Sequence, residues 1–281
     1  MNIIKDSRYG PIIFSDKDKY IGKSFDLYGE FSYHEVNFLK DLIEPGDVAI
    51  DCGANIGGIT IPLAQKIGPE GYMVAFEPQQ YIYHTLCGNV SINNLSNTAV
   101  FQRLASNVSG EVRGMPVLNY EEEGNFGDNS TNRSEENALC IPVATCTIDS
   151  LNLSALNLIK IDVQGEELDV LNGAEETIKR TRPFLYVESE TREESEKVIE
   201  FLNDHEYSHF FHRPPLFNID NFYGNEVDVF DTVDDKGVVN FIVSGNIFAY
   251  PKEKKEWDKT IDRDFFVRNY GEGNYAKEGT I

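Results

Sequence analysis

Asp51, Gly53, Asn55 and Gly57 form the first group of residues whose types and spacing could do chemistry. The segment AIDCGANIGG over 49–58 passes from apolar residues to an acidic side chain and then to a glycine-rich turn. Glycine in such a turn lets the backbone approach a ligand closely, and the start of the next helix offers amide donors that have no partner within the helix. The pattern therefore predicts a binding turn for a small polar molecule.

Glu77 adds an acidic side chain at the end of the next apolar segment, VAFEP. It follows Gly53 by about two dozen positions, close to the roughly 20 residues that separate a glycine turn from the ribose-binding acid in dinucleotide sites. A dinucleotide site also needs G-x-G-x-x-G to hold its pyrophosphate, and Asn55 stands where the second glycine would be. The spacing favours a ribose-bearing ligand, and the asparagine weakens the case for a nicotinamide dinucleotide.

Asp162 and Glu166 form a second acidic pair, in KIDVQGEE over 160–167. A carboxylate here could orient an amino group, accept a proton or bind a divalent ion, and Glu166 could instead stabilise the start of a helix. Proton transfer would require a raised pKa, because an ordinary Asp is a weak base at neutral pH. His212 in HFFHR is a reserve candidate for the base, with a structural role as its alternative.

Strands and helices alternate along the chain in the order that is typical of a parallel sheet. Apolar strands are predicted over 47–51, 72–78, 99–106, 158–163 and 183–189, with helices over 57–67 and 81–93 and after the fourth and fifth strands. Two final strands, 208–213 and 238–250, have no helix between them. We therefore expect an α/β fold with a doubly wound, mostly parallel seven-stranded sheet and an antiparallel strand pair at its C-terminal end. Ligands bind such sheets beyond the carboxyl ends of the strands, where the acidic residues described above lie.

One domain over 32–250 accounts for this pattern, with a lead-in segment over 1–31 and an extension over 251–281. The extension contains Trp257 and the aromatic stretch DFFVRNY, so we expect it to pack on the domain. The acidic segment 119–137 predicts a long surface loop, either a lid or a disordered segment.

Composition narrows the classes of partner. The chain has 281 residues, 25 basic against 47 acidic, and a net charge of −22. Nucleic acid and membranes are not expected as partners, because this excess repels anionic surfaces and no basic patch interrupts it. The four cysteines lack zinc-ligand spacing, so no metal site is predicted, although metal participation stays open. Without an apolar leader or a run of about 20 apolar residues, a cytoplasmic location is expected.

Several motifs, in one order, resemble the FkbM-type methyltransferases. They are AIDCGANIGGIT, VAFEP, TIDSL and LIKIDVQGEELDVLNGA, followed by HRPPLFN and GNIFAYP. Members of that family are class I enzymes that use S-adenosylmethionine and often methylate hydroxyl groups of sugars or natural products. The sequence departs from the family at Gln164, where Glu is common, and in the acidic loop and the C-terminal extension.

The resemblance implies a role for each matching residue. Glu77 would accept hydrogen bonds from the ribose hydroxyls, and Asp162 and Glu166 would stand near the transferred methyl group as catalytic residues. The residues implied to line the methionine and ribose side of S-adenosylmethionine are Asp51, Gly53, Asn55 and Gly57, and those beside the adenine are Ala105 and Ser106. Because alignment of donor and acceptor supplies most of the rate in a methyl transfer, a general base would add about 10² to 10⁴-fold.

The expected function is an S-adenosylmethionine-dependent O-methyltransferase acting on a sugar or another small hydroxylated acceptor. Two alternatives stay open: an NAD-dependent oxidoreductase on a Rossmann-like fold, and a non-catalytic binding module that keeps the cofactor fold. The acceptor pocket is expected between the lead-in segment, the 119–137 loop and the final strands, with Glu30 or Glu35 facing the cofactor. The identity of the acceptor and the oligomeric state are not readable from the sequence.

Overall fold

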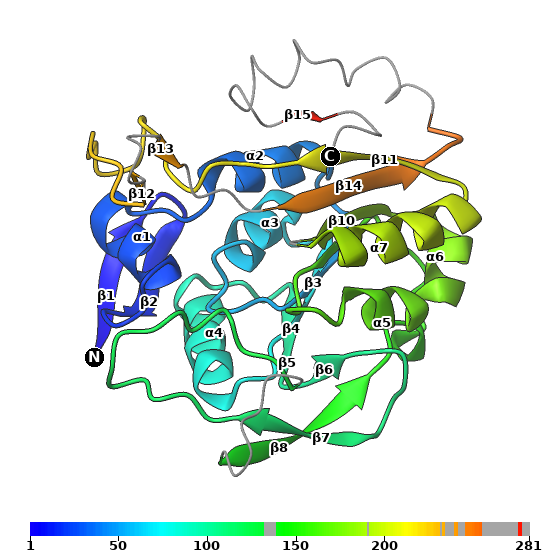
Figure 1. The fold of residues 1–281 in the computed structure, drawn as a ribbon, viewed down its shortest axis with the longest axis horizontal. Coiled ribbons are helices and arrows are strands. Elements are labelled where there is room, and N and C mark those ends of the chain that lie inside the picture. The colour runs from blue at the N-terminus through cyan, green and yellow to red at the C-terminus, as the bar shows by residue number, and fades with distance from the viewer. Residues whose placement is uncertain are drawn as a thin grey trace.

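The computed structural model describes residues 1–131, 139–189, 191–230, 232–233, 239–240, 245–254 and 275–276. Its centre is a twisted sheet with the strand order β15-β11-β14-β10-β9-β3-β4-β5 (Figure 1). The bounds are β15 (Tyr275–Ala276), β11 (Tyr207–His212), β14 (Asn246–Pro251), β10 (Phe184–Glu188), β9 (Leu158–Ile161), β3 (Val48–Cys52), β4 (Tyr72–Phe76) and β5 (Thr98–Phe101). Strands β10 to β5 are parallel, and β14 runs antiparallel to both of its neighbours. The predicted mostly parallel seven-stranded sheet with its antiparallel pair is confirmed, and β15 adds a two-residue edge strand.

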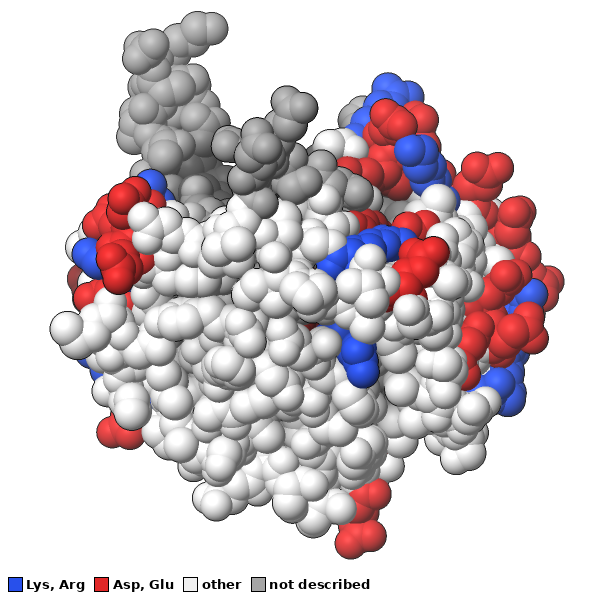
Figure 2. All heavy atoms as spheres, turned by 90° about the horizontal axis from the view of Figure 1, so that it is seen from below, with Lys and Arg blue, Asp and Glu red and all other residues white. Residues whose placement is uncertain are grey.

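The surface carries its charge unevenly. Figure 2 shows one face on which most side chains are uncharged, while Asp and Glu gather along one edge and Lys and Arg are few and scattered. Within the described ranges, no helix combines the length and the apolar character that a membrane crossing requires.

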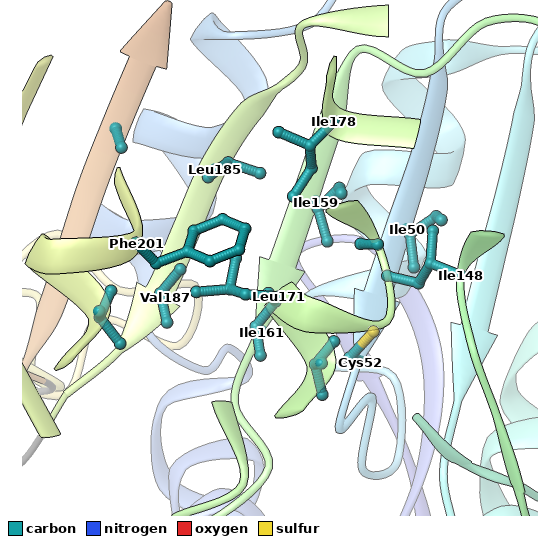
Figure 3. Packing of buried hydrophobic residues seen from close by; sticks show 14 of the residues in the cluster. Ile50, Cys52, Ile148, Ile159, Ile161, Leu171, Ile178, Leu185, Val187 and Phe201 are labelled. Carbon is teal, nitrogen blue, oxygen red and sulfur yellow. The ribbon is translucent and has the colours of Figure 1, made fainter. Parts of the chain in front are cut away.

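Helices cover both faces of the central sheet because its strands alternate apolar side chains between two cores. Ile50 and Cys52 of β3 face one core, where they pack with residues of α5 (Glu167–Asn172), α6 (Glu175–Thr181) and α7 (Arg192–Asp204) (Figure 3). Ala49 faces the other core, beneath α2 (Tyr33–Asp41) and α3 (Thr60–Ile67). Helix α4 (Gln80–Ile92) packs on this second face through Leu86 against Ala75.

The lead-in segment forms an ordered wall beside the sheet. The hairpin β1 (Asn2–Ser7) and β2 (Gly10–Ser15) precedes α1 (Ile21–Tyr28) and packs on α4 (Figure 1). The buried Asn89 side chain joins them, because its Oδ1 accepts from the Ile13 amide at 2.6 Å and its Nδ2 donates to the Ile13 carbonyl at 2.9 Å. This wall brings α1 to the carboxyl edge of the sheet, where its first turn lines a cavity.

Two predicted elements are wrong in their extent. The strand predicted over 99–106 is divided, since β5 ends at Phe101 and β6 (Leu104–Ala105) pairs with a separate sheet of β8 (Cys140–Cys146) and β7 (Val112–Pro116). The helix predicted after 163 is also divided, since α5 ends at Asn172 and α6 begins at Glu175, where the Asp149 carboxylate accepts from the amides of Glu176 and Thr177.

The C-terminal part differs from the prediction in its boundaries. The predicted strand 238–250 corresponds to β14 and to β13 (Val239–Asn240), which pairs with β12 (Thr232–Val233). A short 3₁₀ helix, Asp149–Leu151, precedes β9. Residues 132–137 of the acidic loop, and most of the 251–281 extension including Trp257, lie outside the described residues.

Candidate active site

A cavity of about 340 Å³ lies at the carboxyl ends of β3, β4 and β9. Six of the predicted site residues line it: Gly53, Asn55, Glu77, Ala105, Asp162 and Glu166. Asp51, Gly57 and Ser106 are not among the described residues that line the cavity. The structure therefore brings together residues from three neighbouring strand ends of the parallel sheet, as its topology requires, and adds Ala105 of β6 from the separate three-stranded sheet.

The turn after β3 depends on Gly53. Its φ is +79°, and a Cβ at this position would lie 1.7 Å from the carbonyl oxygen of Asp162. Gly57 also has a positive φ, +94°, and lies against Leu86. Glycine at position 53 thus lets the turns that follow β3 and β9 touch, which closes the floor of the cavity.

Replacing Gly53 with alanine should lower the free energy of unfolding by about 2 kcal/mol, because left-handed strain adds to the backbone clash. Gly46 offers a matched control, since its φ is +94° but an added Cβ meets no described atom within 4 Å. Gly46→Ala should cost only the strain, about 1 kcal/mol. Urea unfolding of both variants measures the difference, and equal losses would show that the contact at Asp162 is unimportant.

Glu77 is buried at the end of β4, with an exposed fraction of 3%. Its Oε2 accepts from the Asn55 amide at 2.9 Å and its Oε1 accepts from the Gln79 amide at 2.8 Å. Burial raises the pKa of this carboxyl to about 7, while the two amide bonds favour the charged form. Each carboxylate oxygen can accept further hydrogen bonds, so Glu77 can hold the turn and still bind ligand hydroxyls.

Lys160 is a buried cation that lines the cavity, with an exposed fraction of 3%. It is the register partner of Asp51 on β3, and its Nζ lies 3.4 Å from Asp51 Oδ1 and 3.1 Å from Asp162 Oδ2. The hydroxyl of Thr60 donates to Asp51 Oδ2 at 2.6 Å. Burial opposes the charge of Lys160, but the carboxylates of Asp162 and Asp51 outweigh it and hold its pKa above the usual value.

Asp162 is held as a carboxylate. Burial acts to raise its pKa, but Lys160, a hydrogen bond with Glu188 and a hydrogen bond from Gln164 Nε2 at 3.1 Å lower it below the usual value. The same amide nitrogen donates to Glu188 Oε2 at 2.9 Å. Glutamine at position 164 therefore bridges two carboxylates, whereas a glutamate there would add a third negative charge.

Glu166 is buried and already engaged. Its Oε2 accepts from Arg113 Nη1 at 2.9 Å, and its Oε1 accepts from the Thr131 hydroxyl. Arg113 also donates to the Ser106 hydroxyl at 3.2 Å. Glu166 thus ties the start of α5 to β7 and to Thr131 of the acidic loop, while Ser106 does not line the cavity.

His212 lies in the core beneath α2. Its Nδ1 is 2.8 Å from the Tyr186 hydroxyl, and its ring is 4.5 Å from the ring of Phe38. Burial lowers its pKa to about 3. The imidazole is therefore uncharged and does not line the cavity.

Sequence reasoning missed two residues and left a third undecided. Lys160 and Glu188 lie within apolar strands and gave no motif of their own, although the alternation of β9 places Lys160 on the same face as Asp162. Glu35, considered together with Glu30, lines the cavity; Glu30 instead binds Arg8 and Asn218. Among the described residues, no group of His, Cys, Asp and Glu side chains is arranged to hold a metal ion.

Comparison with known proteins gives one family model, one similar curated protein and several solved structures of similar fold. A family model described as the methyltransferase FkbM domain matches residues 51–209. Methyltransferase 1 of Beauveria bassiana (strain ARSEF 2860) is 26% identical over 148 residues, 45% of this chain, and the match spans only 58% of that protein. Methyltransferase FkbM from Methylobacillus flagellatus KT has a TM-score of 0.47 at 16% identity, over 81% of this chain and 50% of that one. Precorrin-6y C5,15-methyltransferase from Geobacter metallireducens GS-15 has a TM-score of 0.47 at 12% identity, over 78% and 87% of the two chains.

The site fits S-adenosylmethionine in size and in its donor set. Binding cavities for ligands of this kind measure roughly 300–1,000 Å³. The turn at Gly53 and Asn55 brings backbone to the cavity, and Glu77 presents a buried carboxylate there. The matched residues, 51–209, include the Gly53 turn, Glu77 and Asp162. This chain therefore belongs to the FkbM family of S-adenosylmethionine-dependent methyltransferases.

Proposed function

We propose that the protein transfers a methyl group from S-adenosylmethionine to a hydroxyl group of a sugar or of another small hydroxylated metabolite. The observation that carries the proposal is the single cavity that joins the Gly53 turn, Glu77 and Asp162. Bound there, the cofactor would supply an electrophilic methyl group on a positively charged sulfur. The surrounding residues need only hold that charge, align the acceptor and remove its proton.

The cofactor-binding roles follow from position. Glu77, at the end of β4, accepts hydrogen bonds from the ribose hydroxyls. The buried Ala105 contacts the adenine. Gly53 and Asn55 present the backbone of the turn. Asp162 serves as an anion that orients the positive end of the cofactor, because its lowered pKa makes it a poor proton acceptor.

Three predicted residues, Asp51, Gly57 and Ser106, do not line the cavity and act by positioning neighbouring residues. Asp51 fixes Lys160, and Gly57 lets the helix after the turn pack against Leu86. Ser106 holds Arg113, which in turn holds Glu166. Glu166 therefore acts as a positioning residue for the acidic loop rather than as a base.

The charge of the cavity wall favours an acceptor without phosphate groups. Its acidic residues are Glu35, Glu77, Asp128, Asp162, Glu166 and Glu188, and its basic residues are Arg103 and Lys160. Even with a cationic cofactor in place, an anionic acceptor would meet a repulsive field. The scattered Lys and Arg side chains on the face in Figure 2 offer a phosphate backbone no continuous track.

Two measurements test the proposal. Calorimetric titration with S-adenosylhomocysteine should show one binding site per chain. Mass-spectrometric screening of free sugars and nucleotide sugars with S-adenosylmethionine should then show a gain of one methyl group on an unphosphorylated sugar. An absence of binding heat, or methylation confined to nitrogen or carbon atoms, would contradict the proposal.

Glu77→Gln should weaken S-adenosylhomocysteine binding by about 10-fold, because a neutral amide replaces a charged acceptor for the ribose hydroxyls. Glu167→Gln is the matched control. That buried carboxylate also accepts from two backbone amides, those of Val163 and Gly165, at 3.1 and 3.0 Å, but it does not line the cavity. Equal losses of affinity in the two variants would mean that Glu77 only holds its turn.

A further inference from the structure

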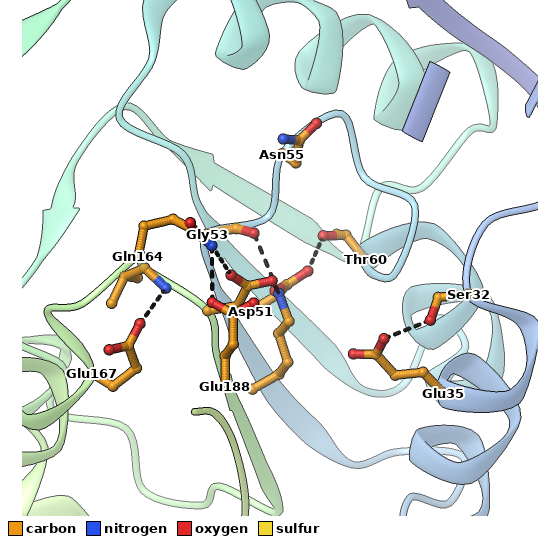
Figure 4. Close-up of polar contacts among 12 residues, drawn as sticks. Ser32, Glu35, Asp51, Gly53, Asn55, Thr60, Gln164, Glu167 and Glu188 are labelled. Carbon is orange, nitrogen blue, oxygen red and sulfur yellow. Dashed lines mark hydrogen bonds and ion pairs between the residues drawn. The ribbon is translucent and has the colours of Figure 1, made fainter. Parts of the chain in front are cut away.

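Glu35 is a buried carboxylate of α2, the helix that packs over the sheet, and its side chain forms part of the cavity wall. Its exposed fraction is 5%, and it lines the cavity. The Ser32 hydroxyl donates to its Oε2 at 2.7 Å, and within the described part of the chain this is its one hydrogen bond. Figure 4 shows the side chain reaching from α2 toward the side on which Asp51 lies.

Glu35 interacts with ionisable groups of β3, β9 and β10. The groups whose charges act on it or respond to it are Lys160 on β9, Asp162 after β9, Asp51 on β3 and Tyr186 on β10. The sheet order places β4, with Glu77, on one side of β3, and places β9 and β10 on the other. Glu35 therefore faces the strand ends at which the methyl group and the acceptor must meet.

Three other carboxylates of this wall, those of Glu77, Asp162 and Glu166, accept hydrogen bonds at both oxygens. Glu77 holds two backbone amides, and Glu166 holds Arg113 and Thr131. Asp162 is bound by Lys160 and Gln164. Among these four, Glu35 alone has an oxygen, Oε1, that accepts no hydrogen bond from the described residues.

We propose that Glu35 is the catalytic base, which accepts the proton of the acceptor hydroxyl as the methyl group is transferred. The inference rests on the proposed function. In the balanced step, a bond forms between the acceptor oxygen and the methyl carbon, the carbon–sulfur bond breaks with its electron pair left on sulfur, and the hydroxyl proton passes to Glu35. The proton then leaves to water, which restores the carboxylate.

The surroundings of Glu35 suit this task. Burial raises its pKa to about 7, while Lys160 and the Ser32 hydroxyl act in the opposite direction. A base works best when its pKa is near the working pH. Because the ionised form is the active one, turnover should rise with pH through about 7 and then level off.

The first test needs no acceptor. S-adenosylmethionine carries a positive sulfonium that S-adenosylhomocysteine lacks, so its binding should favour ionised Glu35 and release about 0.4 proton more at neutral pH. Calorimetry in buffers of different ionisation enthalpy measures this difference for the wild type and for Glu35→Gln. The difference should vanish in Glu35→Gln and persist in Glu30→Gln, a buried carboxylate of the same segment that does not line the cavity.

The second test uses the unphosphorylated sugar that the screen identifies. Glu35→Gln should lower kcat by at least about 100-fold with unchanged S-adenosylhomocysteine affinity. Ser32→Gly removes the hydroxyl that favours ionisation and suits the left-handed backbone of Ser32, whose φ is 45°. It should keep the activity but move the rising limb of the pH profile upward by roughly 0.5–1 pH unit.

The outcomes separate the two proposals. If neither ligand binds the wild type, the proposed function fails. If the wild type binds and methylates but Glu35→Gln keeps both the proton release and the rising limb, the role of Glu35 is overturned while the proposed function stands. Before either comparison, a cooperative thermal unfolding transition should verify that the Glu35→Gln variant is folded.

Discussion

Replacing Lys160 with methionine is expected to lower the free energy of unfolding by about 3–5 kcal/mol, because it removes the cation from a buried group of carboxylates. Asp51 is fully buried and would keep only the Thr60 hydroxyl as a partner for its charge. Asp162 would lose the cation that holds its pKa low. Methionine matches the length of lysine, so the loss reports charge rather than a cavity. Urea unfolding at about pH 8 measures it.

Lys179→Met is the control for this substitution. Lys179 also pairs with two carboxylates, Glu175 at 2.7 Å and Glu176 at 3.4 Å, but its side chain is about half exposed, at 49%. Solvent screens such pairs, so its replacement should cost a small fraction of the loss at Lys160. If the two variants lost equal stability, Lys160 would not be the centre of the buried network.

The fold was largely predictable because one physical rule, alternation of buried strands with amphipathic helices, extends over most of the domain. The same rule placed Gly53, Glu77 and Asp162 at one edge, since parallel strands end on the same side. No long-range information was needed for this step. A strand followed by its helix fixes which end of the strand faces the ligand.

The remaining features depend on contacts between distant segments. The division of 99–106 follows from the pairing of Leu104 with Thr145, which no local pattern of hydrophobicity reveals. The roles of Lys160 and Asp51 follow from their register across β3 and β9. Glu35 required the position of α2 over the sheet. Sequence periodicity identifies an acidic residue on a helix, but tertiary packing decides that it faces a cavity.

A buried carboxylate such as Glu35 should lower the stability of the folded protein at alkaline pH, because its charged form is desolvated. Glu35→Gln should be more stable than the wild type by about 3 kcal/mol at about pH 8, because an amide has no charge to desolvate. The sign follows from the raised pKa. Between about 4.5 and about 7 the folded state binds a proton that the unfolded state has lost, so wild-type stability falls as pH rises through this window.

The advantage of Glu35→Gln should therefore grow by about 2 kcal/mol between about pH 5.5 and about pH 8, as measured by urea unfolding at both values. Glu77 has a similarly raised pKa, but it is present in both proteins and cancels. The exposed Glu193, whose pKa a hydrogen bond from Lys197 lowers, supplies a control without pH dependence, since this carboxyl is ionised in both the folded and the unfolded state over this range and the stability difference of Glu193→Gln should stay nearly constant. An advantage that stays constant with pH would mean that Glu35 ionises as freely in the folded state as in the unfolded chain. A growing advantage combined with lost turnover would show that stability is sacrificed at this position for a base that works near neutral pH.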